Sequence, residues 1–182
     1  LPDCFYHVYN RGNNGETLFR EARNYSYFLT LYKRHADPLL ELHAYCLMGN
    51  HFHLLIRVRP LAVMDALRCR ADEGLRRLFI AYAMAFNSTY DRTGSLFEKP
   101  FHRKPLRNER QVLAVARYIH RNPIHHGFCN NLQDWPWTSY RAYFSDEPHW
   151  IQRDTVLNAA GGRAGFEALH HLPVEDREMP SL

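Results

Sequence analysis

The sequence predicts an α+β fold in which an antiparallel β-sheet carries helices packed on one face. Segments rich in β-branched and aromatic residues, typical of strands, alternate with segments whose apolar residues recur at helical spacing. The predicted order along the chain is β-α-β-β-α-β-α, which gives such a sheet in the manner of ferredoxin-like and RRM-like domains. An apolar content of 46% over 182 residues also supports a globular domain with a substantial core.

Turn-forming residues separate the predicted elements. Gly49-Asn50 joins two strands as a two-residue hairpin turn, and Asp37-Pro38 ends the first helix. The elements are, in order, a strand at 5–10, a helix at 23–35, strands at 41–48 and 51–58, helical pieces within 61–87, an extended segment at 96–106 and a helix at 109–122.

Glycine and proline set three further boundaries. The helical region 61–87 is expected to break near Gly74. Pro100 and Pro105 interrupt the extended segment, which favours an irregular edge strand. Pro123 is expected to close the last of these helices.

The remainder of the chain is expected to be less regular. The segment 135–140, Trp-Pro-Trp-Thr-Ser-Tyr, is predicted to cover the domain with aromatic rings. We therefore expect one domain over residues 1–143 and a C-terminal extension with short helices over 144–182. Asp154 is expected to cap the first of those short helices, at 155–160.

Composition narrows the classes of function. No apolar run approaches the ~20 residues of a membrane span and no signal-peptide pattern opens the chain, so a cytoplasmic protein with no membrane partner is expected. The four cysteines form no C-x-x-C pair, which argues against a zinc site built on them. A net charge of +4 and a pI near 8.9 permit a nucleic-acid partner without requiring one.

His51 and His53 form the first candidate site. Alternate residues of a strand point to one face about 7 Å apart, so the two imidazoles lie together while Phe52 points to the opposite face. Two ligands on a rigid strand can hold a metal if a third arrives from elsewhere. Strand histidines also often satisfy polar neighbours, and with twelve histidines in the chain such a pair can arise by chance.

Tyr118 and Asn122 form the second candidate site, near the end of the predicted helix at 109–122. Residues i and i+4 share a helical face, with Cβ atoms about 6 Å apart. An amide oxygen is a competent metal ligand, and a tyrosine beside it can act as a nucleophile. The spacing equally fits a tyrosine at a core edge and an asparagine that ends a helix before proline. His120, His125 and His126 lie nearby and could compete with Asn122 as ligands.

Five motifs occur in a fixed order along the chain, and together they are far more specific than any one alone. In them the chain resembles the single-tyrosine HUH transposases, in particular the REP-associated tyrosine transposase (RAYT-like) branch, from about Tyr6 to Tyr143. The motifs are Tyr6-His7-Val8-Tyr9-Asn10-Arg11-Gly12, Ala44-Tyr45-Cys46-Leu47-Met48-Gly49-Asn50-His51-Phe52-His53-Leu54-Leu55, Gly94-Ser95-Leu96-Phe97, Tyr118-Ile119-His120-Arg121-Asn122-Pro123 and Trp135-Pro136-Trp137-Thr138-Ser139-Tyr140.

The resemblance implies a role for each candidate residue. The histidine-hydrophobic-histidine motif of the family falls on His51 and His53, which implies that both are metal ligands. The catalytic tyrosine, carried on a late helix, falls on Tyr118, and the third ligand falls on Asn122. Residues 1–143 then correspond to an HUH transposase-like catalytic domain.

The implied activity is metal-dependent cleavage and transfer of single-stranded DNA. Similar proteins cleave beside an imperfect hairpin, leaving a 5′-phosphotyrosine and a free 3′-hydroxyl, and reversal with another 3′-hydroxyl transfers the strand without ATP. The divalent metal, Mg²⁺ or Mn²⁺, neutralises charge that develops on the phosphate, and this donor set suits Mn²⁺ better. No carboxylate base for Tyr118 is evident. Similar proteins occur as homodimers and as monomers, so both states stay open.

Basic side chains in the segments around this site are candidates for phosphate contacts. Phe97 and Phe101 alternate with them and could stack on unpaired bases. Because a lone surface arginine is usually solvated and either phenylalanine is more often a core residue, the expectation applies to the group rather than to each member. The candidate DNA-binding residues are Arg11, Arg57, Arg59, Lys99, Arg103, Lys104, Arg107 and Arg121.

Three other functions stay open on the sequence. A non-catalytic binder of structured DNA or RNA on the same fold is the main alternative, although an intact set of four site residues argues against it. Replication initiators and relaxases share the histidine motif but are usually larger, with tyrosines in a different order or number. A metal hydrolase without a tyrosine intermediate is the third.

Overall fold

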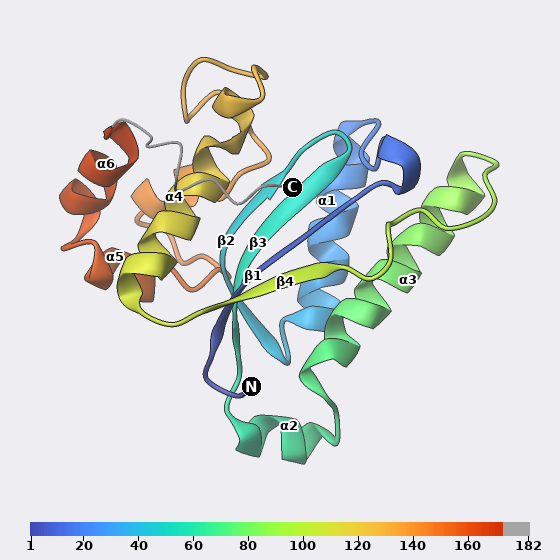
Figure 1. Cartoon of the computed structure of the whole chain (residues 1–182), viewed down its shortest axis with the longest axis horizontal. Coiled ribbons are helices and arrows are strands. Elements are labelled where there is room, and N and C mark those ends of the chain that lie inside the picture. The colour runs from blue at the N-terminus through green and yellow to red at the C-terminus, as the bar shows by residue number, and fades with distance from the viewer. Residues whose placement is uncertain (173–182) are drawn as a thin grey trace.

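The computed structural model describes residues 1–172. Its four antiparallel strands lie in the order β2-β3-β1-β4 (Figure 1). The strands are β1 (Phe5–Arg11), β2 (Leu40–Leu47), β3 (His51–Val58) and β4 (His102–Leu106). The helices are α1 (Ala22–Leu31), continued by a π-helical turn (Tyr32–Ala36), α2 (Leu61–Leu67), α3 (Ala71–Thr89), α4 (Glu109–His125), α5 (Asp154–Ala159) and α6 (Arg163–His171), with 3-10 turns at Asn13–Gly15 and Tyr140–Phe144.

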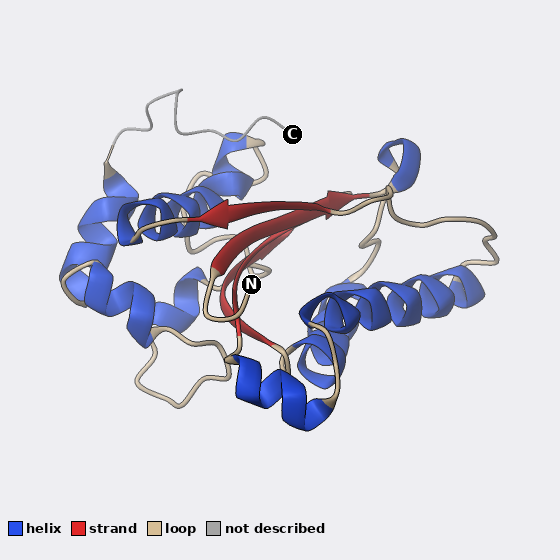
Figure 2. Cartoon of the chain, turned by 60° about the horizontal axis from the view of Figure 1, so that its bottom comes forward, coloured by secondary structure: helices blue, strands red, loops and turns tan. Residues whose placement is uncertain are grey.

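Helices cover both faces of the sheet. Helices α1 and α3 pack against one face, while α4 lies over the other, next to α5 and α6 (Figures 1 and 2). We call these the helix-pair face and the α4 face. The predicted α+β class and antiparallel sheet are confirmed, and α1 and α3 share a face as expected. The position of α4 differs from that expectation. The physical reason is that β2 and β3 are buried on both faces, which is typical of a strand between two layers.

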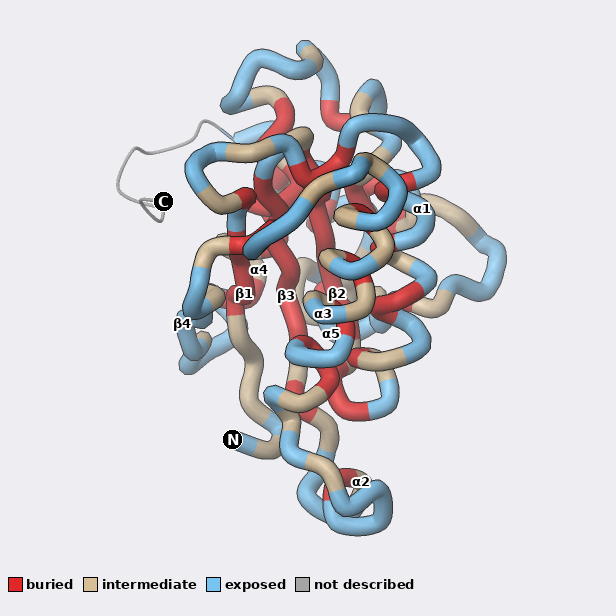
Figure 3. Tube along the Cα trace, turned by 90° about the vertical axis from the view of Figure 1, so that its right-hand side faces the viewer, coloured by how far each residue is buried: buried red, intermediate tan, exposed pale blue. Residues whose placement is uncertain are grey.

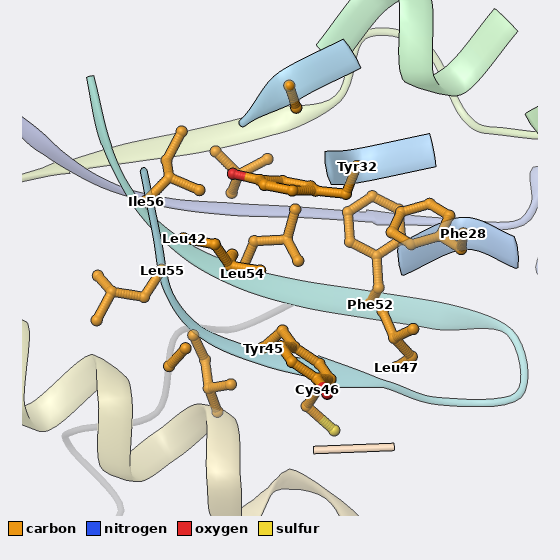
Figure 4. Packing of buried hydrophobic residues seen from close by; sticks show 14 of the residues in the cluster. Phe28, Tyr32, Leu42, Tyr45, Cys46, Leu47, Phe52, Leu54, Leu55 and Ile56 are labelled. Carbon is orange, nitrogen blue, oxygen red and sulfur yellow. The ribbon is translucent and has the colours of Figure 1, made fainter. Parts of the chain in front are cut away.

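The core follows the alternation of side chains along the strands. Phe52 and Ile56 point to the side of Phe28, whereas Leu55 and Cys46 point towards α4 (Figure 4). The rings of Phe28 and Phe52 lie 5.1 Å apart, and all five residues are buried. Figure 3 shows that the central strands are mostly buried, whereas the edge strand β4 is exposed. Phe52 therefore points away from the histidine pair, as predicted.

The β2–β3 hairpin fixes the register of the candidate ligands. The Met48 amide donates to the carbonyl oxygen of His51 at 2.8 Å across the predicted two-residue turn. In β1, Tyr9 pairs with His53 and Arg11 pairs with His51. Since paired residues of antiparallel strands point to the same face, both histidines lie on the α4 face.

The predicted break near Gly74 is wrong. Helix α2 ends at Leu67, Arg68 adopts a left-handed conformation with φ 49°, and α3 then runs unbroken through Gly74. A Cβ atom on Gly74 would lie 3.0 Å from the Cα of Ala36. Glycine at this position permits close packing of α3 on the π-helical turn and does not interrupt the helix.

Three other boundaries also differ. Strand β4 occupies only the end of the predicted extended segment, and it tolerates Pro105 because β4 is an edge strand. Helix α4 continues past Pro123 to His125. A proline removes only one amide donor, and because Pro123 lies in the last turn this loss does not end the helix before it. Asp154 is the first residue of α5 and not its cap.

The segment 135–140 covers the free edge of β2, in agreement with the expected docking. The Trp135 indole donates to the Leu47 carbonyl oxygen at 3.0 Å, and the Ser139 amide donates to the Tyr45 carbonyl oxygen at 3.0 Å. These bonds satisfy backbone groups that an open edge strand would expose.

Residues after 143 pack against the same core. Phe166 and His170 of α6 are fully buried, and Arg121 of α4 donates to the His170 carbonyl oxygen at 2.7 Å. His120 of α4 lies between α6 and the 135–140 segment, with its Nδ1 2.9 Å from His170 Nε2 and its Nε2 2.7 Å from Ser139 Oγ.

None of the helices within residues 1–172 is both long and apolar enough to cross a bilayer.

Buried histidines predict a loss of stability in mild acid. Burial lowers the pKa of His7 to about 3 and that of His43 and His170 to about 4. The unfolded chain, with histidine pKa values of about 6.5, takes up protons below that pH that the folded chain does not. We expect each histidine to lower the free energy of unfolding by about 1.4 kcal/mol per pH unit between its two pKa values.

Urea unfolding of the metal-free protein between about pH 7 and about pH 4.5 measures this slope. His43→Leu is the matched variant, since it removes one of the three groups and should make the dependence shallower. An equal slope in His43→Leu and the wild type would contradict the assignment.

Candidate functional site

The α4 face brings the four predicted site residues together, where α4 passes beside β3 (Figure 1). His51 Nε2 lies 3.1 Å from Asn122 Oδ1. The rings of His53 and Tyr118 meet edge to face with centroids 5.3 Å apart. All four side chains therefore belong to one site formed by a strand and a late helix.

His51 has the orientation of a neutral metal ligand. Its Nδ1 donates to Asn50 Oδ1 at 2.8 Å, which leaves a lone pair on Nε2. That lone pair faces Asn122 Oδ1, which is also an acceptor. Burial lowers the pKa of His51, which disfavours a bridging proton at neutral pH. Two acceptor atoms thus converge, as they do around a cation.

His53 has one nitrogen engaged and one nitrogen free. Its Nδ1 lies 3.0 Å from His7 Nε2 in a buried contact. Its Nε2 is buried and has no hydrogen-bond partner among residues 1–172, a situation that costs about 1–3 kcal/mol for a polar group. Burial holds the pKa of His53 well below its usual value, so the ring is in the neutral form that binds metals.

The donor set fits a divalent cation such as Mg²⁺ or Mn²⁺. Asn122 is fully buried, and its Nδ2 has no partner in the described part of the chain. Within residues 1–172, no group of three or more histidine, cysteine, aspartate and glutamate side chains is arranged to hold a metal. A site here therefore depends on the amide oxygen of Asn122 beside His51 and His53.

Tyr118 lies against the two inner histidines. Its ring contacts His53 and His7 edge to face, with centroid separations of 5.3 and 5.8 Å. Burial raises the pKa of Tyr118 above its ordinary value, and the nearby Asn122 side chain partly offsets this rise. The phenol is therefore protonated at neutral pH and must lose its proton when the oxygen attacks.

The three competing histidines have different positions. His120 is buried between α6 and Ser139, away from the site. His125 is exposed. The ring of His126 lies 5.0 Å from that of His51, so His126 is the competitor nearest to the proposed ligands.

Two of the predicted basic residues lie beside the site. Arg11 pairs across the sheet with His51 and forms a partly exposed ion pair with Glu98 at 2.7 Å. Lys104 pairs with His7, and its ammonium lies 5.8 Å from the ring centre of Tyr9. Both side chains are on the α4 face.

The other candidates lie elsewhere. Arg57 and Arg59 are at the far end of β3, where both approach Glu41 and Arg57 also binds Asp3 at 2.9 Å. Arg121 is bound to α6. Lys99, Arg103 and Arg107 are exposed in and around β4, and Arg103 is on the helix-pair face.

Sequence reasoning missed the contact of His7 with His53, and it left Phe97 open between stacking on a base and a place in the core. Phe97 is only 5% exposed and packs on Phe79, so it is a core residue and is not available to stack on a base. Alternation along β1 indicates that His7 and Tyr9 point to the same face of the sheet. The sequence does not show that this face is the one with His53, because that depends on the pairing of β1 with β3.

Comparisons with known proteins show what the chain resembles in sequence and in fold. No family model matches the chain. A Haemophilus influenzae protein named for the REP-associated tyrosine transposases is 24% identical over 117 residues, covering 62% of this chain and 66% of that protein. A solved structure of a REP-associated tyrosine transposase bound to a REP hairpin aligns with a TM-score of 0.67, over 85% of this chain and 88% of that chain, at 14% identity.

The chain is similar in sequence to one protein named for the REP-associated tyrosine transposases and similar in fold to another. The match with the transposase of known structure shows a shared fold, four antiparallel strands with helices. The match with the Haemophilus protein spans just under two thirds of that protein's length, at 66%.

Proposed function

We propose that this protein is a metal-dependent single-strand DNA endonuclease and strand transferase that acts through Tyr118 beside a DNA hairpin. The convergence of His51, His53 and Asn122 next to the Tyr118 ring is the observation that carries the proposal. The names of the relatives support the substrate, since one is a transposase bound to a REP hairpin. The hairpin as partner, and a homodimer or monomer as the active form, belong to this proposal.

The chemical step is a transesterification. The Tyr118 oxygen attacks the phosphorus of the scissile phosphodiester, and the bond from phosphorus to the 3′ oxygen breaks. The phenol proton is lost and the departing oxygen gains one, so a 3′-hydroxyl and a 5′-phosphotyrosine result. The reverse reaction with a different 3′-hydroxyl joins new ends, and the phenolate is a good enough leaving group for this because its ordinary pKa is about 10.

The chain's own residues prepare this step. His51, His53 and Asn122 would hold a Mg²⁺ or Mn²⁺ ion, which supplies positive charge at the phosphate. Packing of Tyr118 against His7 and His53 limits the positions of the phenol ring. The Asn122 side chain, one helical turn from Tyr118, partly offsets the rise in the Tyr118 pKa that burial causes.

A covalent-adduct assay tests the proposal. The protein is incubated with Mn²⁺ and an end-labelled single-stranded oligonucleotide that contains an imperfect hairpin. We expect a denaturant-stable protein–DNA adduct and a free 3′-hydroxyl product, both lost with chelator and with the same sequence as a full duplex. Binding of the hairpin without any adduct would instead favour the non-catalytic binder.

Arg11 and Lys104 are expected to contact phosphates because both lie on the α4 face beside the site. Each neutralised phosphate of a single strand contributes about 0.7 to the slope of log affinity against log salt. Arg11→Ala and Lys104→Ala should each reduce the slope by about 0.7, measured by fluorescence anisotropy with a labelled hairpin.

Arg57→Ala is the matched control for this measurement. Arg57 is an equally basic strand residue that also forms an ion pair, with Asp3, but it lies at the far end of β3 from His51. We expect its salt slope to equal that of the wild type. A reduction as large as that of Arg11→Ala would place the DNA along the whole sheet and contradict our interpretation.

A further inference from the structure

His7 is a buried histidine outside the predicted ligand set. It lies in the middle of β1 and is 1% exposed. Its Nε2 is 3.0 Å from Nδ1 of His53, and the two rings are stacked with centroids 5.1 Å apart. The His7 ring also contacts the Tyr118 ring edge to face, with centroids 5.8 Å apart. His7 thus touches both a proposed ligand and the proposed nucleophile.

Only one arrangement of protons leaves His53 free to bind a cation. If His7 Nε2 carries the proton and donates to His53 Nδ1, then neutral His53 must carry its own proton on Nε2. That proton removes the lone pair that a metal requires. If His53 Nδ1 donates to His7 Nε2, the lone pair of His53 Nε2 is available and buried without another partner among residues 1–172.

We propose that His7 is the positioning residue that accepts the His53 Nδ1 proton and so fixes His53 in its metal-binding tautomer. Metal-binding histidines are usually oriented in this way through their second nitrogen, with a carboxylate, a carbonyl or water as acceptor. Here a second neutral imidazole fills that role. The inference rests on the proposed function, because it assumes that His53 binds a divalent cation.

The neighbouring histidine has an acceptor of its own. His51 donates through Nδ1 to Asn50 Oδ1, so each proposed imidazole ligand has its second nitrogen engaged and its Nε2 directed at the site. The two acceptors come from different elements, since Asn50 lies in the β2–β3 turn and His7 lies in β1. Their effects on metal binding are therefore separable by mutation.

The test compares three substitutions at one position. Glutamine places its amide oxygen near the position of histidine Nε2, whereas the shorter asparagine reaches only the position of Nδ1, and leucine keeps the volume without an acceptor. We expect His7→Leu and His7→Asn to weaken Mn²⁺ binding by about 10–100-fold. His7→Gln should stay within a few-fold of the wild type. His43→Leu, which removes another buried histidine away from the site, should leave Mn²⁺ binding unchanged.

Isothermal titration with Mn²⁺ measures the affinity without any turnover, and thermal unfolding checks that each variant is folded. Imidazole NMR of the Mg²⁺-saturated wild type should locate the His53 proton on Nδ1. If the wild type binds Mn²⁺ and His7→Leu and His7→Asn bind it equally well, His7 has no positioning role and the proposed function stands.

If the wild type itself binds no Mn²⁺, the proposed function fails and this inference fails with it. Should His7→Leu not fold, the glutamine and asparagine variants still decide the question, since both are polar and differ in reach. Equal Mn²⁺ affinities in that pair would overturn the proposal.

Discussion

Replacement of Tyr118 by phenylalanine is expected to abolish the protein–DNA adduct and to lower the cleavage rate by about 10³-fold or more, because it removes the attacking oxygen. The phenylalanine ring keeps the edge-to-face contacts with His7 and His53. Hairpin affinity and Mn²⁺ affinity should therefore match those of the wild type. Single-turnover cleavage and anisotropy measure the two properties separately.

Tyr9→Phe is the matched control for this variant. Tyr9 is also a tyrosine on the α4 face, and its ring lies 5.7 Å from that of His53. Its hydroxyl has no role in our account, so adduct formation should stay within a few-fold of the wild type. Adduct formation that survives Tyr118→Phe and disappears in Tyr9→Phe would identify Tyr9 as the nucleophile and contradict our assignment.

Asn122→Ala is expected to have the second largest effect. It removes the one oxygen ligand of the proposed set and leaves two imidazoles, which hold a hard cation poorly. We expect a loss of about 10²-fold or more in Mn²⁺ affinity and a matching loss of cleavage at low Mn²⁺ concentration. Asn122→Asp, which keeps the oxygen and adds charge, should retain or increase Mn²⁺ affinity.

His126→Ala separates this account from its nearest rival. His126 is close enough to His51 for ring contact and could replace Asn122 as the third ligand. Our assignment predicts that His126→Ala binds Mn²⁺ nearly as well as the wild type. Loss of binding in His126→Ala together with normal binding in Asn122→Ala would move the third ligand to His126.

The local geometry of the site could be predicted from the sequence because it depends on short-range periodicity. Strand parity places His51 and His53 on one face, and a helical turn places Tyr118 beside Asn122. Both relations occur in the structure. Alternation along a strand does not show which helix covers that face. That the histidine pair lies next to Tyr118 and Asn122 could therefore be inferred only from the resemblance to a known family or from the structure.

Features that depend on tertiary packing were not predictable in the same way. Gly74 resembles a helix breaker in sequence, yet it serves the close approach of α3 to Ala36. His7 contacts His53 only through the register of β1 with β3. Arg57 resembles Arg11 in sequence, but β1 pairs Arg11 with His51, whereas Arg57 lies at the far end of β3 beside Asp3. In each case the deciding neighbour is distant along the chain.

Mapping the DNA-linked residue is the most direct test of the central claim. The adduct formed with Mn²⁺ and the hairpin oligonucleotide is digested with protease and nuclease, and the modified peptide is sequenced by tandem mass spectrometry. Our account predicts a nucleotide phosphate attached to Tyr118 through its 5′ end. Attachment at any other residue, or cleavage products without a linked peptide, would contradict it.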